Sequence, residues 1–144
     1  KFRRQRQMCI RDRIYYLEQY GNKNSFPPLG IEYDRKVYNI AKKNIFNICK
    51  LNKNNINLVL DSATNFEEYL SSKSLVIYLY NSFQGKTLDI VLKKLSKYEH
   101  ILIYIDPAEG HKIHDYNYKF ISENKGRYNA ESWIIAKNII YENR

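Results

Sequence analysis

Four short segments of this chain are almost entirely apolar, and polar stretches separate them from one another. Continuous apolar runs of this length are typical of strands in a parallel sheet, because helices cover such a sheet on both faces. The four predicted strands span residues 29–33, 56–60, 75–80 and 101–105. We expect the third run to form a central strand that is covered on both faces.

Two segments between these strands have the periodicity of helices. The first is predicted over residues 35–50, where Asp34 occupies the N-cap position and apolar residues recur every three or four positions. Its apolar positions are Val37, Ile40, Ala41, Ile45 and Ile48. The second begins at Gly85, and its apolar stripe consists of Leu88, Val91, Leu92 and Leu95. A short polar connection over residues 62–70 is also predicted to be helical.

The pattern changes after Pro107. Residues 118–123 and 133–141 are predicted as two further strands, and no adequate helix separates them, so we expect them to pair antiparallel. Earlier in the chain, strands and helices alternate, which implies right-handed crossovers and a parallel sheet with helices on both faces. The sequence therefore predicts a three-layer α/β fold, in which an antiparallel strand pair closes a mostly parallel sheet.

The composition agrees with one globular domain. The 144 residues are 44% hydrophobic and 27% charged, which is enough apolar material for a single core. No apolar run approaches the roughly 20 residues that cross a bilayer, and no signal-peptide pattern is present, so we expect a cytoplasmic protein without a membrane partner. Cys9 and Cys49 lack metal-site or redox spacing, and we interpret both as plain thiols.

The net charge of +9 is concentrated near the N-terminus. Residues 1–13 contain six basic residues against the single acid Asp12, so they carry more than half of that charge. Within them, the string from Met8 to Arg13 resembles the translation of a transposase adapter used in sequencing libraries. We interpret residues 1–13 as a non-native segment and exclude them from the fold. The alternative is a genuine basic arm that binds nucleic acid or extends a helix.

The end of the first predicted strand resembles the second strand of class I (Rossmann-like) S-adenosylmethionine-dependent methyltransferases. In that family, Gly-x-Glu/Asp precedes a helix, and the sequence here is Gly30-Ile31-Glu32-Tyr33-Asp34. The resemblance implies that the Glu32 carboxylate accepts hydrogen bonds from both ribose hydroxyls of the cofactor, with Tyr33 beside it. The alternative is a carboxylate that only interacts with the N-terminus of the next helix, a role that Asp34 fits better.

The second predicted strand ends in Asp61-Ser62-Ala63, which is similar to the family's Gly-Asp-Ala motif. The resemblance implies that this segment contacts the adenine of S-adenosylmethionine, because the family's acid accepts the adenine amino group. Asp61 occupies the usual Gly position and Ser62 the usual Asp position, so the contact either shifts to Asp61 or is made by Ser62. Asp61 can also be an ordinary surface acid.

The third predicted strand is followed by Asn81-Ser82-Phe83, which resembles the Asn-Pro-Phe type of motif of several methyltransferases. The resemblance implies catalytic roles for Asn81, whose amide orients the methyl acceptor, and for Phe83, which packs against it. Ser82 replaces the motif's proline, which leaves specificity for an amine open. A simple turn at the end of the strand is the alternative.

The sequence contains no Gly-x-Gly motif, which in this family follows the first strand and holds the cofactor closely. Residues from Ile14 onward resemble the family from the start of its first helix, so we interpret residues 14–144 as a partial methyltransferase domain that lacks the first strand and the glycine loop. We expect the chain as given to bind S-adenosylmethionine poorly and to be inactive. Its methyl acceptor is not predicted.

Two other classes of function remain open. One is a basic nucleic-acid-binding module, and the other is a noncatalytic Rossmann-like interaction domain. The interleaved lysines and tyrosines of residues 112–128 are read as a solvated face rather than as a nucleic-acid surface. No metal site is expected at His111 and His114, because two histidines three residues apart need further ligands.

Overall fold

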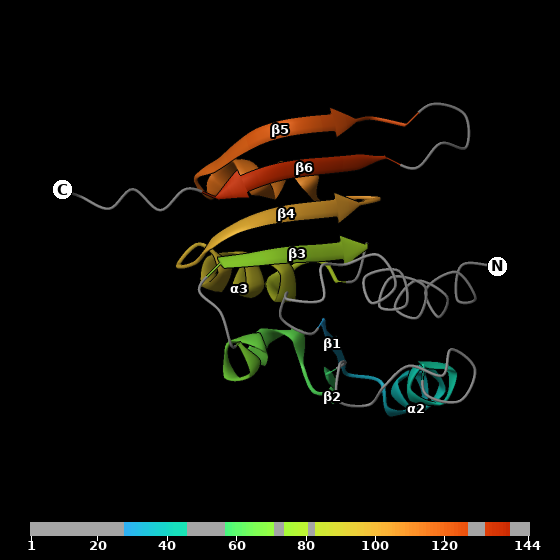
Figure 1. Cartoon of the computed structure of the whole chain (residues 1–144). Coiled ribbons are helices and arrows are strands. Elements are labelled where there is room, and N and C mark those ends of the chain that lie inside the picture. The colour runs from blue at the N-terminus through green and yellow to red at the C-terminus, as the bar shows by residue number, and fades with distance from the viewer. Residues whose placement is uncertain (1–27, 46–56, 71–73, 81–82, 127–131, 139–144) are drawn as a thin grey trace. The chain divides into compact units, whose positions relative to one another are not determined.

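The computed structural model describes residues 28–45, 57–70, 74–80, 83–126 and 132–138 (Figure 1). Contacts within the chain divide it into two compact units, which cover residues 1–71 and 72–144. Each unit has its own strands, and the two units are described separately below. No helix in the described ranges has the length and apolar character needed to cross a membrane.

The first unit contains two parallel strands joined through a helix. Strand β1 (Leu29–Glu32) pairs with β2 (Asn57–Leu60) in a register that runs from Leu29 opposite Asn57 to Glu32 opposite Leu60. Both strands are within one residue of their predicted bounds. Because they are parallel and in register, their carboxyl ends lie side by side at one edge.

Helix α2 (Arg35–Lys43) follows β1 and begins where the sequence predicts. The Asp34 carboxylate accepts hydrogen bonds from the backbone N–H groups of Lys36 (2.7 Å) and Val37 (3.2 Å), which satisfies donors that no preceding turn can pair. Ala41 and Ile45 are buried as expected. The prediction was wrong for Ile40, which is 41% exposed because it lies at the margin of the apolar face. The rest of the predicted helix, including Ile48, lies outside the described residues.

The polar connection after β2 is a 3-10 helix rather than an α-helix. This helix, η3 (Ala63–Tyr69), is capped by Ser62, whose hydroxyl oxygen accepts from the Thr64 N–H at 3.3 Å. Phe66 is its one buried residue, which explains the absence of a clear apolar stripe in the sequence.

The second unit contains a four-stranded sheet in the order β3-β4-β6-β5 (Figure 1). The strands are β3 (Ser74–Tyr80), β4 (Glu99–Ile105), β5 (Tyr118–Asn124) and β6 (Trp133–Asn138). Strand β3 is parallel to β4, and β6 is antiparallel to both β4 and β5. The antiparallel ending predicted from the sequence is therefore confirmed. The predicted end of β6 extends to residue 141, and residues after Asn138 lie outside the described part.

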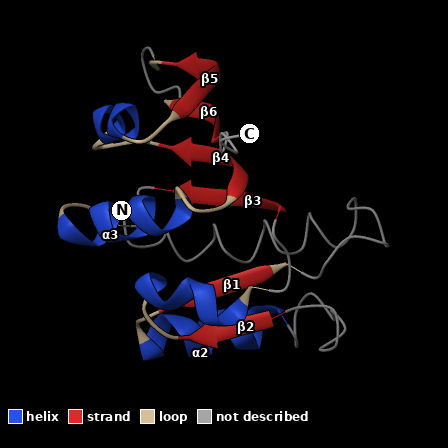
Figure 2. Cartoon of the chain, turned by 90° about the vertical axis from the view of Figure 1, so that its left-hand side faces the viewer, coloured by secondary structure: helices blue, strands red, loops and turns tan. Residues whose placement is uncertain are grey.

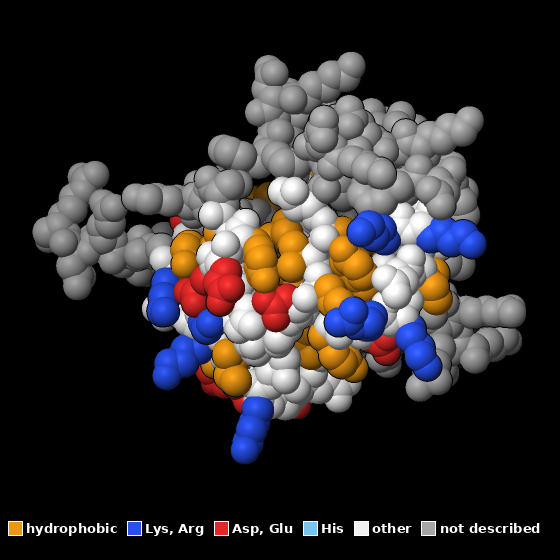
Figure 3. Space-filling model, turned by 90° about the horizontal axis from the view of Figure 1, so that it is seen from below, with side chains coloured by type: hydrophobic (Ala, Val, Ile, Leu, Met, Phe, Trp, Pro, Cys, Tyr) orange, Lys and Arg blue, Asp and Glu red, His pale blue; other side chains and the backbone are white. Residues whose placement is uncertain are grey.

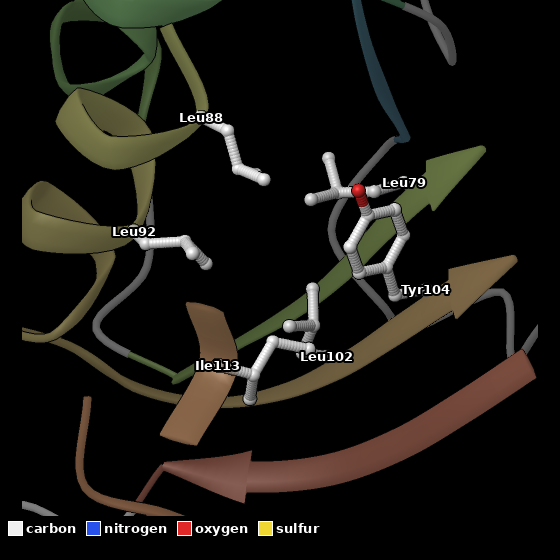
Figure 4. Close-up of a cluster of buried hydrophobic side chains, with 6 residues drawn as sticks. All are labelled: Leu79, Leu88, Leu92, Leu102, Tyr104 and Ile113. Atoms are coloured by element: carbon white, nitrogen blue, oxygen red, sulfur yellow. The ribbon is translucent and has the colours of Figure 1, made fainter. Parts of the chain in front are cut away.

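Helices cover one face of this sheet. Helix α3 (Lys86–Leu95) and the 3-10 helix η4 (Gly110–Asp115) both lie on the same side of the strands (Figure 2). Figure 4 shows that their side chains point toward those of β3 and β4 and form a core of Leu79, Leu88, Leu92, Leu102, Tyr104 and Ile113. All four residues of the predicted α3 stripe are buried, so that periodicity identified the packed face correctly.

The other face of the sheet differs from the sequence prediction. Strand β3 was expected to be covered on both faces, yet Val76 is 69% exposed and Tyr78 is 39% exposed, whereas Leu79 is buried. Burial alternates along β4 as well. Within the residues that the structure describes, this sheet therefore has a single covered face.

Strands β1 and β3 belong to separate sheets. The family resemblance predicts that the segments of β1 and β3 either pair directly or leave a gap, at the place of the family's first strand, that the N-terminal segment partly covers. Direct pairing does not occur between these two described strands. Each unit nevertheless keeps the parallel pairing that the apolar runs predict.

Candidate cofactor site

The end of β1 places a carboxylate with unused hydrogen-bonding capacity at the edge of the first unit. Oxygen Oε1 of Glu32 accepts a hydrogen bond from the Asp34 N–H at 2.9 Å, and the side chain is half-buried. Its other oxygen, Oε2, accepts no hydrogen bond from any residue that the structure describes. Glu32 can therefore accept at least two further hydrogen bonds, while Asp34 alone caps the helix.

Asp61, at the end of β2, is held by three neighbours from its own segment. Oδ1 accepts from the backbone N–H of Ser62 (2.6 Å) and from the Asn65 amide (3.0 Å), and Oδ2 accepts from the Tyr69 hydroxyl (2.6 Å). The Tyr69 bond, followed by those from Ser62 and Asn65, lowers the pKa of Asp61. The same bond to Asp61 raises the pKa of Tyr69 to about 12.

This network determines how much of Asp61 remains available. A carboxylate oxygen has two lone-pair sites, so Oδ1 is fully used and Oδ2 can accept one more hydrogen bond. The Ser62 hydroxyl is used locally, since it bonds the Thr64 hydroxyl at 2.8 Å and caps η3, which begins at Ala63. Among the residues predicted to contact adenine, Asp61 can therefore accept a further hydrogen bond through Oδ2. The Ser62 hydroxyl already bonds within the start of η3.

The two carboxylates lie on neighbouring strands. The Asp61 N–H donates to the Glu32 carbonyl oxygen at 3.0 Å, which continues the β1–β2 pairing by one step. Tyr33 lies next to Glu32, and its side chain is 79% exposed. The structure thus places the five residues predicted for the cofactor at one edge of the first unit: Glu32, Tyr33, Asp61, Ser62 and Ala63.

The predicted catalytic residues belong to the second unit. Asn81 lies outside the described residues, as does Ser82. Phe83 is half-buried and packs against the core cluster shown in Figure 4. The aromatic ring after β3 is therefore fixed by the core, whereas the proposed role of Asn81 is not tested.

Sequence reasoning missed an ionic cluster that holds the segment after Phe83. Oxygen Oε2 of Glu109 accepts from the Gly85 N–H at 2.7 Å, although the two residues are 24 positions apart. The Lys112 ammonium contacts Asp89 at 2.9 Å and Glu109 at 3.3 Å. The Gly85 bond lowers the pKa of Glu109, and the Asp89 hydrogen bond raises the pKa of Lys112. Gly85 has a φ of 61°, which a side chain would disfavour, so the cluster fixes a special turn.

The end of β4 contains a strained residue and a buried hydroxyl. Asp106 has a φ of 46°, a left-handed conformation that few non-glycine residues adopt, and its N–H donates to the Ser132 carbonyl at 2.8 Å. Tyr104 is 1% exposed, and burial raises its pKa. Both features fall at the carboxyl end of a parallel strand, where open α/β sheets place ligand-binding residues.

The described part of the chain does not bring the histidines together with other metal-binding side chains. In the described ranges, no three His, Cys, Asp or Glu side chains are grouped so that they could hold a metal ion. The His114 ring instead stacks on Phe120, with ring centroids 4.7 Å apart.

Comparisons with solved structures identify the fold. An rRNA methylase from Streptococcus thermophilus matches 79% of this chain over 74% of its own length, with a TM-score of 0.54 and 11% identity. TrmK from M. capricolum, solved with S-adenosyl-homocysteine, matches 87% of this chain over 55% of its own, with a TM-score of 0.61 and 19% identity. A protein in the NADB-Rossmann superfamily from Streptococcus agalactiae matches 86% of this chain over 56% of its own, with a TM-score of 0.64 and 16% identity.

Sequence comparison adds no assignment, because no protein-family model and no curated protein matches the chain. At identities of 11–19%, the likeness to solved structures concerns the fold. The α/β architecture, the parallel pairs and the antiparallel ending are those of Rossmann-like methyltransferases, and this chain shares that fold.

Proposed function

We propose that the chain binds S-adenosylmethionine at the edge formed by the ends of β1 and β2 and serves methyl transfer. The observation that carries this proposal is oxygen Oε2 of Glu32, which no described residue uses, one strand away from an Asp61 carboxylate on which the described residues leave one lone pair. The shared fold with methyltransferases supports the same assignment.

The acceptors at this edge fit an adenosine group. Two vicinal ribose hydroxyls are donors, and Glu32 can accept both of them. An exocyclic adenine amine is also a donor, and Oδ2 of Asp61 has room for one such bond. The exposed Tyr33 ring offers a flat apolar surface beside Glu32 on which a base can stack.

Methyl transfer from a sulfonium requires little acid catalysis. When bound, S-adenosylmethionine supplies an electrophilic methyl group on a sulfonium whose leaving group is a neutral thioether. The protein's task is then to align the lone pair of the acceptor, and orientation of this kind can supply much of the rate. We assign that alignment to Asn81 and to Phe83, which the core holds in place.

The proposed acceptor class is RNA. One similar structure is described as an rRNA methylase. Of the net charge of +9, residues 1–13 carry +5, so residues 14–144 carry +4, a positive charge that favours a polyanionic substrate. Because the sequence has no Gly-x-Gly motif, we expect the contacts to adenosine to dominate and the affinity for the cofactor to be low.

A photochemical experiment tests cofactor binding even when affinity is low. Ultraviolet irradiation of the protein with methyl-labelled S-adenosylmethionine would attach label covalently to a nearby side chain. We expect labelling that S-adenosylhomocysteine competes away, that Glu32→Ala strongly reduces and that the exposed Glu68→Ala variant retains. Competition by NAD as strong as that by S-adenosylhomocysteine would contradict a methyltransferase site.

The same variants separate binding from transfer. Asn81→Ala and Phe83→Ala are expected to keep photolabelling and to lower any transfer of methyl label to RNA. Labelling without measurable transfer is the result expected of the chain as given, whereas transfer that stays at the wild-type level in Asn81→Ala and Phe83→Ala would remove both residues from the proposed roles.

A further inference from the structure

Helix α2 has one basic face. At about 100° per residue, positions 35, 36, 39, 42 and 43 fall within an arc of about 120°. The residues of this α2 basic face are Arg35, Lys36, Asn39, Lys42 and Lys43, and all five are exposed. The buried residues Ala41 and Ile45 lie on the opposite side.

The charges of this face are not paired with acidic side chains among the residues that the structure describes. Helix α2 contains no acidic residue, and its four cations form no ion pair with any residue in the described ranges. Two lysines of the second unit, by contrast, are paired, Lys112 with Asp89 and Lys137 with Glu99 at 3.0 Å. The Lys42 ammonium lies over the Tyr38 ring, 5.7 Å from its centroid.

Fold stability does not account for the whole face. Lys42 and Lys43 occupy the last turn, where they favour the helix dipole. Arg35 and Lys36 occupy the first turn, where positive charge opposes it. Positive charge is thus kept along the entire face, including the end at which it weakens the helix.

We propose that the α2 basic face binds the phosphate backbone of the RNA acceptor, an inference that rests on the function proposed above. Lys, Arg and Asn side chains are common donors to phosphate oxygens, whereas protein interfaces are depleted in lysine and rely on aromatic and apolar anchors. The arc contains no such anchor. The face is about 12 Å long from Arg35 to Lys43, which spans about three phosphates at the ~3.4 Å spacing along a duplex.

The position of the face relates it to the cofactor edge of the same unit. Its first residue, Arg35, follows Asp34, whose N–H donates to Glu32 at 2.9 Å. An RNA strand lying along α2 therefore reaches the residues proposed to hold adenosine. The described surface is not basic everywhere, since Figure 3 shows acidic and apolar side chains between the basic ones on the face in view.

The test compares two double variants that remove equal charge. Lys42→Gln with Lys43→Gln alters the α2 basic face, and Lys86→Gln with Lys93→Gln alters exposed positions of α3. Both are made in the full chain, and circular dichroism checks that each remains folded. Binding of a short, labelled single-stranded RNA of mixed sequence is measured by fluorescence anisotropy at several salt concentrations.

We expect the α2 variant to bind RNA about tenfold more weakly at ~0.15 M salt, and its salt slope to fall by about 1.4, which is about 0.7 for each lost charge. The α3 control is expected to keep the wild-type slope. An unchanged slope in the α2 variant, or an equal loss in the control, would overturn the proposal. The proposal would also be overturned if the α2 variant lost binding to polyglutamate while its binding to RNA was unchanged, because that result assigns the face to an acidic protein.

The photolabelling experiment distinguishes failure of this proposal from failure of the proposed function. Intact labelling by S-adenosylmethionine with an unchanged RNA slope rejects the α2 basic face and leaves the function standing. If S-adenosylmethionine labels nothing and the α2 variant has a reduced salt slope for RNA, the proposed function is rejected and the role of the α2 basic face stands.

Discussion

The Asp61 N–H donates to the Glu32 carbonyl oxygen at 3.0 Å, so the two acidic residues stand at adjacent ends of parallel strands. Their carboxylates have different surroundings. Among the described residues, the Glu32 carboxylate has one partner, the Asp34 N–H, whereas the Asp61 carboxylate has three. We therefore assign the main cofactor contact to Glu32 and a single additional hydrogen bond to Asp61.

Glu32→Ala is expected to weaken S-adenosylmethionine binding by roughly 10- to 100-fold, because two hydroxyl contacts to a charged acceptor are lost. The ratio of dissociation constants, measured by titration of both proteins, checks this value. The affinity of Glu32→Gln for S-adenosylmethionine is expected to lie between those of the wild type and Glu32→Ala, since glutamine keeps an acceptor oxygen and loses the charge. Equal affinities for wild type and Glu32→Ala would remove Glu32 from the site.

Tyr69→Phe is expected to lower the melting temperature at neutral pH, because Asp61 loses the bond that most lowers its pKa. A carboxyl with a lowered pKa in the folded state stabilises the protein above about pH 4, and this stability is lost as the pH falls through the folded value. The difference between variant and wild type is thus expected to shrink in acid. The exposed Tyr33→Phe variant is the control. If its melting temperature were as low as that of Tyr69→Phe, the account would be contradicted.

The burial of His100 is expected to make the protein less stable on mild acidification. It is 2% exposed, its Nδ1 bonds the Tyr98 carbonyl at 2.8 Å and its Nε2 bonds the Tyr118 hydroxyl at 2.6 Å. Burial lowers the pKa of His100, so the unfolded chain takes up the proton first as the pH falls below about 6.5. The melting temperature is therefore expected to fall from about pH 7 to about pH 5.

A matched pair of histidine variants checks the origin of this pH dependence. His100→Gln is expected to flatten the profile of melting temperature against pH, whereas exposed His111→Gln leaves it unchanged. The same profile in His100→Gln and wild type would assign the acid sensitivity to other groups.

Glu109→Ala is expected to speed hydrogen exchange at the Gly85 amide, because that N–H loses its 2.7 Å acceptor. Glu109→Gln keeps an acceptor and is expected to retain much of the protection. Glu99→Ala, which removes only a surface ion pair with Lys137, is the control. Wild-type exchange at Gly85 in Glu109→Ala would show that the cluster does not hold this turn.

The elements of this fold were largely predictable, because local periodicity reports burial. The stripe of Leu88, Val91, Leu92 and Leu95 gave α3, and all four residues are buried. The division into two sheets was not predictable from such patterns, since a strand's own sequence does not identify its neighbours. The exposure of Val76 escaped for the same reason: an apolar run indicates that a strand can be covered on both faces, not that it is.

The site was predictable only in part. Glu32 and Asp61 could be placed because each directly follows an apolar run, and parallel strands end at one edge. The engagement of Asp61 by Tyr69 depends on the geometry of η3, which has no strong periodic signal. The Glu109 bond to Gly85 joins segments 24 residues apart, and no local pattern indicates such a contact.

The central claim is that the adenosine group of S-adenosylmethionine binds at the ends of β1 and β2. Backbone amide shifts in nuclear magnetic resonance spectra, followed while S-adenosylhomocysteine is added to the full chain, test it directly because they detect weak binding and locate it. We predict saturable shifts at Glu32, Tyr33, Asp61 and Ser62 that adenosine reproduces and that Glu32→Ala removes. Absence of shifts at high ligand concentration, or shifts confined to β5 and β6, would contradict the account.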